Sequence, residues 1–146
     1  MSHSLIDNLR FQKASVSRWS PSENTVYYAG LRSSADRQIL LHELGHALSG
    51  HTSYDKDIEL IKLEREAWRV ARDLAPHYSV DINPELVEEH LDSYRDWLHA
   101  RSRCPHCHSP GVQRHDGEYH CVLCDSRWTA NDARQCGLKR YTKTPL

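Results

Sequence analysis

The 146-residue sequence lacks any apolar run long enough to cross a membrane, and residues 1–20 lack the apolar segment of a secretory signal peptide. We therefore expect a cytoplasmic protein with no membrane partner. Hydrophobic residues make up 38% of the chain and charged residues 27%, a balance that is ordinary for folded proteins and argues against disorder. The length suffices for one modest core and a small appended module.

A large excess of one charge is also absent, because the formal net charge is −1. The charges are unevenly distributed, however. Residues 1–100 carry 11 Lys/Arg and 16 Asp/Glu, a net −5, whereas residues 101–146 carry 8 Lys/Arg and 4 Asp/Glu, a net +4. Four thiolates on one zinc ion would lower the second value to about +2. This mildly basic segment allows contact with nucleic acid without requiring it.

Cysteine is scarce, and four of the five cysteines form two Cys-x-x-Cys pairs, namely Cys104, Cys107, Cys121 and Cys124. In a reducing compartment such pairs indicate a metal site rather than disulfides. The 13 residues between the pairs match a structural zinc site with four thiolate ligands. Asp116-Gly117 predicts a hairpin turn between them. We predict a zinc ribbon over residues 101–130, which needs its metal because so small a module buries little apolar surface.

A His-Glu-x-x-His sequence lies in the apolar segment from Gln38 to Leu48. In a helix, residues four apart share a face, so His42 and His46 can present two imidazole nitrogens to one metal ion. Glu43 lies beside them, within reach of a metal-bound water. Zinc suits such ligands and lowers the pKa of bound water to about 7, so that a nearby carboxylate can take its proton. The motif is the signature of metalloproteases.

The alternative for this segment is an ordinary amphipathic helix with two histidines. Its other side is apolar, which would hold a zinc-binding helix rigidly, and Gly45 would let another element approach closely. Gly50 is a plausible helix stop. The longer metzincin signature would require Gly in place of Ser49 and His in place of Thr52, which argues against that class. We expect His51 to lie at the surface or beside the ligands rather than to be a ligand.

Residues 57–75 predict a second long helix, ended by Pro76. A third metal ligand should come from its carboxylates, which are Glu59, Glu64 and Glu66. Glu64 falls toward the apolar face of this helix, and a carboxylate on a buried face is costly unless it binds a cation. We therefore prefer Glu64 as the third ligand, with Glu66 as the reserve. The alternative is a solvated charged face without a ligand.

A strand is predicted by the β-branched and aromatic residues Thr25, Val26, Tyr27 and Tyr28. In zincin-type proteases an edge strand beside the metal pairs with the substrate backbone and holds the scissile carbonyl over the zinc. We therefore consider these residues a candidate substrate strand, although the tyrosines could instead only pack in the sheet. Tyr54, in the loop after the first helix, is a candidate donor to the developing oxyanion. The alternative is a solvent-facing tyrosine.

The order of these motifs resembles the ImmA/IrrE family of metallo-endopeptidases. The resemblance covers roughly residues 20–80 and rests on the strand, on His42-Glu43-Leu44-Gly45-His46-Ala47-Leu48 with Gly50-His51, and on Glu64-x-x-Ala67-x-x-Val70-Ala71-x-x-Leu74. It implies a compact zincin-like domain that cleaves regulatory proteins, often transcriptional repressors. It also implies metal ligands at His42, His46 and Glu64 and a general base at Glu43. Val70 departs from the family, which usually has Phe there, and Pro76 comes about one residue early.

We predict an α+β fold with three segments. A compact zincin-like domain over residues 1–100 would contain a small sheet, the active-site helix and the second ligand helix. The zinc ribbon over residues 101–130 and a basic tail over residues 131–146 would follow. Two zinc ions are expected per chain, one catalytic and one structural. The predicted function is a zinc-dependent endopeptidase acting on a regulatory or DNA-bound protein, with DNA contact through the ribbon and tail as a further expectation.

Two alternatives stay open. SprT/Spartan-like proteases also combine His-Glu-x-x-His with a C-terminal zinc ribbon and act on DNA-bound protein. That class takes its third ligand from a histidine, for which His51 or His77 would be the candidates here. The other alternative is a non-catalytic regulator that binds DNA or protein, in which the first metal site is only structural.

Overall fold

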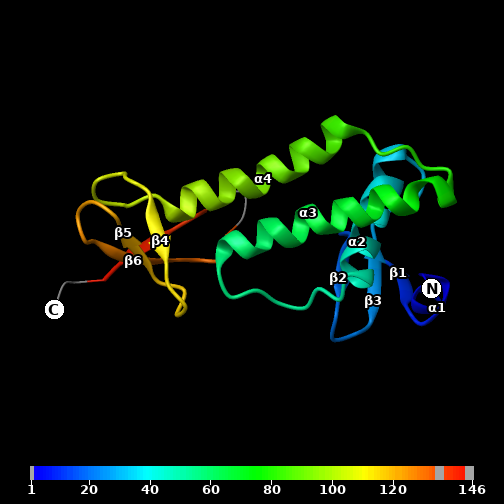
Figure 1. Ribbon diagram of the computed structural model, residues 1–146, viewed down its shortest axis with the longest axis horizontal. Helices are drawn as coiled ribbons and strands as arrows, with labels where there is room; N and C mark the ends of the chain where they lie inside the picture. The colour runs from blue at the N-terminus through cyan, green and yellow to red at the C-terminus, as the bar shows by residue number, and fades with distance from the viewer. Residues whose placement is uncertain (1, 134–136, 144–146) are drawn as a thin grey trace. The chain divides into compact units, whose positions relative to one another are not determined.

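The computed structural model describes residues 2–133 and 137–143 and combines helices with small sheets, which confirms the predicted α+β class (Figure 1). The elements are α1 (Ser2–Asp7), β1 (Arg10–Lys13), β2 (Arg18–Ser20), β3 (Thr25–Tyr28), α2 (Ser34–Leu48), α3 (Asp57–Leu74), the 3₁₀ helix η1 (Ala75–Tyr78), α4 (Pro84–Ser102), β4 (Gly111–Gln113), β5 (Tyr119–Cys121), β6 (Arg127–Ala130) and β7 (Arg140–Thr142). Among the described helices, none is long and apolar enough to span a bilayer.

The chain forms two compact units that are not continuous in sequence. Unit 1 comprises Met1–Ser53 and Lys62–Glu89, and unit 2 comprises Tyr54–Ile61 and His90–Leu146. The division between the units therefore falls within α3 and within α4. The domain boundary predicted at residue 100 also lies inside α4.

The sheet of unit 1 has the strand order β1-β3-β2. β3 pairs with β1 in parallel, with Phe11 opposite Val26, and with β2 in antiparallel orientation, with Trp19 opposite Val26. Thr25–Tyr28 is thus a strand, as predicted, but the expectation that it lies at an edge is wrong. Within the described residues, the edges of this sheet are β1 and β2.

The first predicted helix is α2, which packs against β3 and β2. Its N-terminus is capped by Ser33, whose hydroxyl accepts a hydrogen bond from the Asp36 N–H at 3.0 Å. Its apolar side is anchored by the buried Leu41 and Leu44. Gly50 follows the helix with a φ of 69°, the left-handed conformation that ends many helices. The predicted stop of this helix is confirmed.

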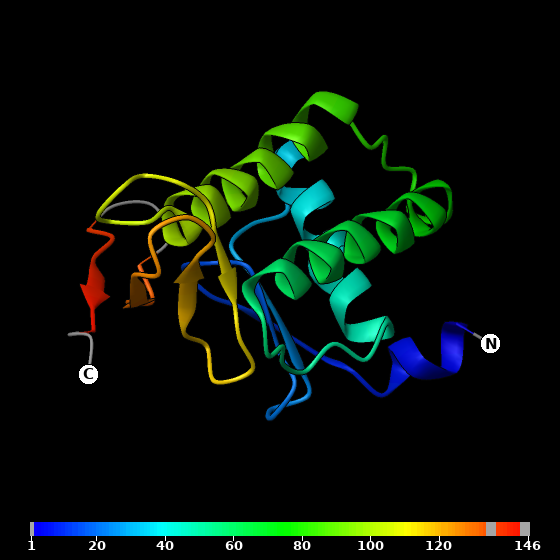
Figure 2. The ribbon, with the colours of Figure 1, turned by 60° about the vertical axis from the view of Figure 1, so that its left-hand side comes forward.

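α2 and α3 cross closely in both ribbon views (Figures 1 and 2). At the crossing, a Cβ atom on Gly45 would lie only 2.2 Å from the Ala67 carbonyl oxygen. No side chain fits between the two backbones at this point. The absence of a side chain at Gly45 therefore allows the approach that the sequence predicts.

α4 begins with Pro84 in its first turn, and Asn83 is its cap. The Asn83 side-chain oxygen accepts from the Glu85 N–H at 3.0 Å. Within unit 1, the side-chain oxygen of the buried Gln38 accepts from the Asn83 N–H at 2.8 Å. This hydrogen bond ties the start of α4 to α2.

Unit 2 contains a second sheet, with the strand order β4-β5-β6-β7. The predicted hairpin turn has Gly117 at a φ of 86°, and β6 pairs with β5 beyond the hairpin. β7 was not predicted, because it lies in the segment interpreted as a basic tail. Of residues 131–146, the structure describes 131–133 and 137–143, and Arg134 lies outside the described residues. The core of this unit consists of Cys104, Tyr119, Cys121 and Trp128.

A buried polar network joins the start of α3 to the rest of unit 2. The carboxylate of Asp57 accepts from Arg101 Nε at 2.8 Å and from the Tyr119 hydroxyl. The Asp57 N–H donates to the Gln113 side chain at 2.7 Å, and the Trp128 indole N–H donates to the Arg101 carbonyl at 2.9 Å. Asp57 is 4% exposed, so the hydrogen bonds compensate the cost of burying its charge.

Gly45→Ala is expected to destabilise the protein by about 1–3 kcal/mol or more, because the new methyl group would overlap the Ala67 carbonyl. Gly30→Ala is the matched control, since its new methyl group would meet only the movable Asp36 carboxylate. Thermal unfolding measures the loss of stability in both variants. An equal change in the two variants would contradict the close crossing.

Tyr119→Phe removes one hydrogen bond to the buried Asp57 carboxylate and is expected to cost about 1.5–3 kcal/mol, the range for hydrogen bonds to charged groups. Tyr141→Phe on β7 is the control, because the Tyr141 side chain is exposed. Urea unfolding of both variants measures the two free energies of unfolding. If Tyr119→Phe unfolds like the control, the network does not stabilise the unit.

Candidate metal centres

The first candidate centre lies in unit 1, where α2 and α3 bring together two histidines and one glutamate. The His42 and His46 Nε2 atoms are 3.2 Å apart. Glu64 Oε2 lies 2.7 Å from His42 Nε2 and 3.2 Å from His46 Nε2. All three residues are buried. The structure therefore joins the three residues that the sequence predicts to be ligands.

These distances fit a tetrahedral metal ion. Zinc bonds of about 2.0–2.1 Å to nitrogen and oxygen place neighbouring ligand atoms about 3.3 Å apart. The measured separations of 2.7–3.2 Å are close to that value. Two imidazoles and a carboxylate are also a donor set that zinc accepts. Among the described residues, His42, His46 and Glu64 form a group that can hold a metal ion.

The electrostatic environment keeps Glu64 in the form that binds a metal. Burial alone would raise the pKa of Glu64, but hydrogen bonds from His42 and His46 outweigh it and hold the pKa well below its usual value. For His46, burial acts to lower the pKa, and the Glu64 carboxylate reverses the effect, so the pKa lies above its ordinary value. The carboxylate is therefore ionised at neutral pH.

Packing fixes the orientation of the His42 ring. It stacks on the indole of Trp68, with the ring centroids 4.4 Å apart and the planes 27° from parallel. Trp68 is fully buried and directly follows Ala67, the residue at the helix crossing. Sequence reasoning assigned Trp68 no function. The only available signal was a large aromatic residue next to the small one that allows the crossing.

Glu43 is half-buried on α2, next to His42. Burial is the main cause that raises the pKa of Glu43 to about 7, and the negative charge of Glu64 adds to it. The positive charge of His46 and a hydrogen bond from the Trp19 backbone act in the opposite direction. Trp19 lies on β2, so this edge strand contacts the predicted general base.

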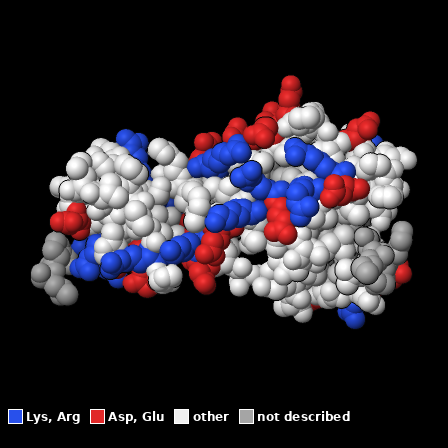
Figure 3. All heavy atoms as spheres, in the orientation of Figure 1, with Lys and Arg blue, Asp and Glu red and all other residues white. Residues whose placement is uncertain are grey.

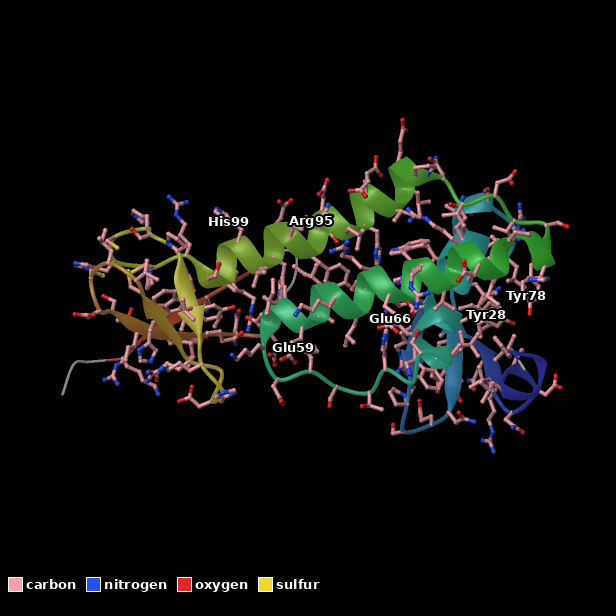
Figure 4. The ribbon with its side chains drawn as sticks, in the orientation of Figure 1. Tyr28, Glu59, Glu66, Tyr78, Arg95 and His99 are labelled. Carbon is pink, nitrogen blue, oxygen red and sulfur yellow. The ribbon has the colours of Figure 1, made fainter. Side chains whose placement is uncertain are left out.

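His51 and Glu66 lie behind the first centre rather than in it. His51 Nδ1 is 2.9 Å from His46 Nδ1, and His51 Nε2 is 3.3 Å from Glu66 Oε2. Glu66 reaches from α3 toward the segment that follows α2 (Figure 4). The Trp19 indole N–H donates to the His51 carbonyl at 2.9 Å. His51 therefore lies beside the candidate ligand His46, and the reserve candidate Glu66 contacts His51 instead of the cluster.

The candidate substrate strand is corrected by the sheet order. Neighbouring strands occupy both sides of β3 in the described part of the chain, so the residues Thr25, Val26, Tyr27 and Tyr28 offer no open edge to a peptide. The Tyr27 hydroxyl donates to Glu23 at 2.8 Å, and the Arg18 guanidinium lies 4.2 Å from the centre of the Tyr27 ring. Tyr54 is exposed and belongs to unit 2. Its function as an oxyanion donor stays a prediction.

The second candidate centre is the cysteine cluster of unit 2. The Sγ atoms of Cys104 and Cys124 are 3.7 Å apart, and those of Cys107 and Cys121 are 3.4 Å apart. Zinc–sulfur bonds of about 2.3 Å place tetrahedral thiolates about 3.8 Å apart. The four sulfur atoms therefore lie close enough together to hold one metal ion.

The two Cys-x-x-Cys turns have equivalent sets of hydrogen bonds. Cys104 Sγ accepts from the N–H groups of His106 and Cys107 at 3.4 and 3.5 Å. The corresponding bonds to Cys121 Sγ come from the N–H groups of Leu123 and Cys124, at 3.3 and 3.4 Å. Such donors stabilise a thiolate, which is the form of cysteine that binds metals.

The backbone conformation is also the same in the two Cys-x-x-Cys turns. The residue after each second cysteine is left-handed, with a φ of 66° at His108 and 61° at Asp125. The N–H of each first cysteine donates at 2.8 Å to a carbonyl five residues later, which belongs to Ser109 in one turn and to Ser126 in the other. Two equivalent turns therefore present their sulfur atoms to a common point.

Comparison with protein-family models, with curated proteins and with solved structures finds no match to this chain. The chemistry of the two centres is therefore the basis on which a function can be assigned.

Purified protein is expected to hold one divalent ion for each centre. Glu64→Ala should lose one ion and keep the other, whereas Cys121→Ser should lose the ion of the cysteine cluster. Glu85→Ala, at an exposed position of α4, is the control. Elemental analysis of the purified variants measures the number of metal ions bound per chain. An unchanged content in Glu64→Ala would show that Glu64 is not a ligand, and His51 and His77 would be tested next.

Proposed function

We propose that the protein is a zinc-dependent endopeptidase of the ImmA/IrrE type, with a zincin-like arrangement of small sheet, active-site helix and second ligand helix. His42, His46 and Glu64 would hold the catalytic zinc, and the four ribbon cysteines would hold a structural zinc. One observation carries the proposal: a half-buried carboxylate, Glu43, lies next to a buried cluster of two imidazoles and one carboxylate. Catalytic zinc sites have this ligand number and keep a further position for water or substrate.

The two carboxylates of the site would have different functions. A zinc ion held there supplies a Lewis acid that polarises the substrate carbonyl and activates water. Glu64 is ionised and turned toward both histidines, so it serves as a ligand. Glu43 has a pKa raised to about 7, and a carboxylate with such a pKa can take a proton from water and return it to the leaving amine.

The substrate backbone would pair with β2 rather than with β3. β2 is an edge strand of the described sheet, and the Trp19 backbone on it forms a hydrogen bond with Glu43. A peptide added to the outer edge of β2 would therefore pass beside the general base. Main-chain pairing of this kind recognises an extended segment with little dependence on its sequence.

The substrate would be a regulatory or DNA-bound protein, with a transcriptional repressor as the first candidate. Basic groups outnumber acidic ones around the sheet of unit 2, where the single carboxylate of Glu118 lies among His120, Arg127 and Lys143, and this excess would serve for recruitment. Basic side chains also lie over this sheet on the face that Figure 3 shows. Protein or nucleic acid with negative charge would be attracted to them.

The SprT/Spartan-like alternative is less consistent with the site. That class requires a histidine as the third ligand, whereas the third side chain of this cluster is Glu64. His51 faces the outer nitrogen of His46, and His77 is exposed on η1. The geometry therefore favours the ImmA/IrrE type.

Glu43→Gln is expected to keep both metal ions and to lower proteolysis by at least about 100-fold, because general acid–base catalysis contributes about 10²–10⁴-fold. The amide has nearly the same shape as the carboxylate but cannot accept a proton. Cleavage of fluorescent casein and of candidate repressors, with metal content measured on the same samples, tests this expectation.

Glu89→Gln, at an exposed position of α4, is the matched control and should cut like the wild type. Equal activity of Glu43→Gln and wild type would remove Glu43 from the mechanism. If wild-type protein with both ions bound cuts none of these substrates but binds DNA tightly, the endopeptidase proposal is wrong and the non-catalytic regulator is favoured.

A further inference from the structure

A chain of three side chains leads outward from the first metal centre. His46 Nδ1 contacts His51 Nδ1 at 2.9 Å, and His51 Nε2 contacts Glu66 Oε2 at 3.3 Å. The side chains of His46 and His51 are 11% and 9% exposed, whereas that of Glu66 is 46% exposed. The chain therefore begins at a buried ligand atom and ends at the surface.

The metal centre determines where each proton of this chain lies. A neutral imidazole carries one proton, so one nitrogen donates and the other accepts. His46 Nε2 faces His42 and Glu64 and must keep its lone pair for a metal ion. Its proton is then on Nδ1 and is donated to His51 Nδ1. His51 in turn carries its proton on Nε2 and donates it to Glu66. Only this arrangement makes both contacts hydrogen bonds.

The backbone of His51 is held on both sides. The His51 N–H donates to the His46 carbonyl at 3.1 Å, a bond made where Gly50 turns into the left-handed conformation. The His51 carbonyl accepts from the Trp19 indole at 2.9 Å. The imidazole is thus directed at His46 by contacts from α2 and from β2.

We propose that His51 and Glu66 are positioning residues for the metal ligand His46. They fix the tautomer with the proton on Nδ1 and orient the ring, which raises the affinity of Nε2 for a metal ion. This inference depends on the proposed zinc site. Partners of this kind behind a ligating histidine typically contribute about 10–100-fold to metal affinity.

The first test measures zinc affinity by competition with a chelator, using full-length protein. His51→Leu is expected to bind the zinc of the first centre about 10–100-fold more weakly. His51→Asn should restore most of the affinity, because its side-chain oxygen lies as many bonds from Cα as Nδ1 and can accept from His46. His77→Leu, at an exposed position, is the matched control. Circular dichroism of the zinc-loaded variants checks that the fold is kept.

The second test reads the tautomers directly from nitrogen NMR of the zinc-loaded protein. The expected result is a proton on Nδ1 of His46 and on Nε2 of His51. Glu66→Leu should remove the preference at His51 and weaken zinc binding, and Glu89→Leu should change neither. A purely structural contribution of His51 would not produce this pair of tautomers.

The outcomes separate this inference from the proposed function. A wild-type protein without zinc at His42, His46 and Glu64 would overturn both. A wild-type protein that holds the zinc, together with a His51→Leu variant of equal affinity, would overturn only the inference about His51. Zinc-loaded protein without a proton on Nδ1 of His46 and on Nε2 of His51 would also overturn only the inference about His51.

Discussion

The close crossing of α2 and α3 is the constraint on which the first centre depends. Gly45 and Ala67 leave no side chain between the two backbones, so the carboxylate of Glu64, one turn before Ala67, can reach the imidazoles of α2. Trp68, one residue after Ala67, packs against the His42 ring at the same place. The small residues at the crossing thus set the distance between the candidate ligands, and Trp68 beside them orients one of these side chains.

Burial acts to raise the pKa of both carboxylates of this region, and the two differ in how strongly neighbouring groups compensate it. Glu64 is compensated by two histidines, so its pKa falls. Glu43 has weaker compensation from His46 and the Trp19 backbone, and burial raises its pKa to about 7. In the proposed function, this difference would make one acid the metal ligand and the other the proton acceptor. Such a separation of pKa values between neighbouring acids is a common property of catalytic sites.

Local patterns in the sequence predicted the two helices of the first centre and most of the candidate metal ligands. Helix periodicity and stop signals gave α2 and α3, and ligand spacing gave the two histidines and the four cysteines. The apolar face of α3 gave Glu64. The strand order could not be predicted, because β1 and β2 are only four and three residues long and β1 is exposed throughout. β1 also pairs with β3 in parallel, between residues 15 positions apart in sequence. The contacts of Trp19 with Glu43 and His51 could not be predicted either, because β2 itself was not. β7 was not predicted because its residues resemble a polar tail.

Unit 2 takes one of its buried groups from the middle of the chain. Asp57 lies 47 positions before Cys104, yet Arg101 and Tyr119 direct their donors at its carboxylate. A gene fragment that encodes only the cysteine-rich segment would therefore encode an incomplete module. Such a fragment would leave the donors of Arg101 and Tyr119 without the carboxylate that they contact in this structure. A recombinant fragment that is meant to contain unit 2 should therefore begin before Asp57.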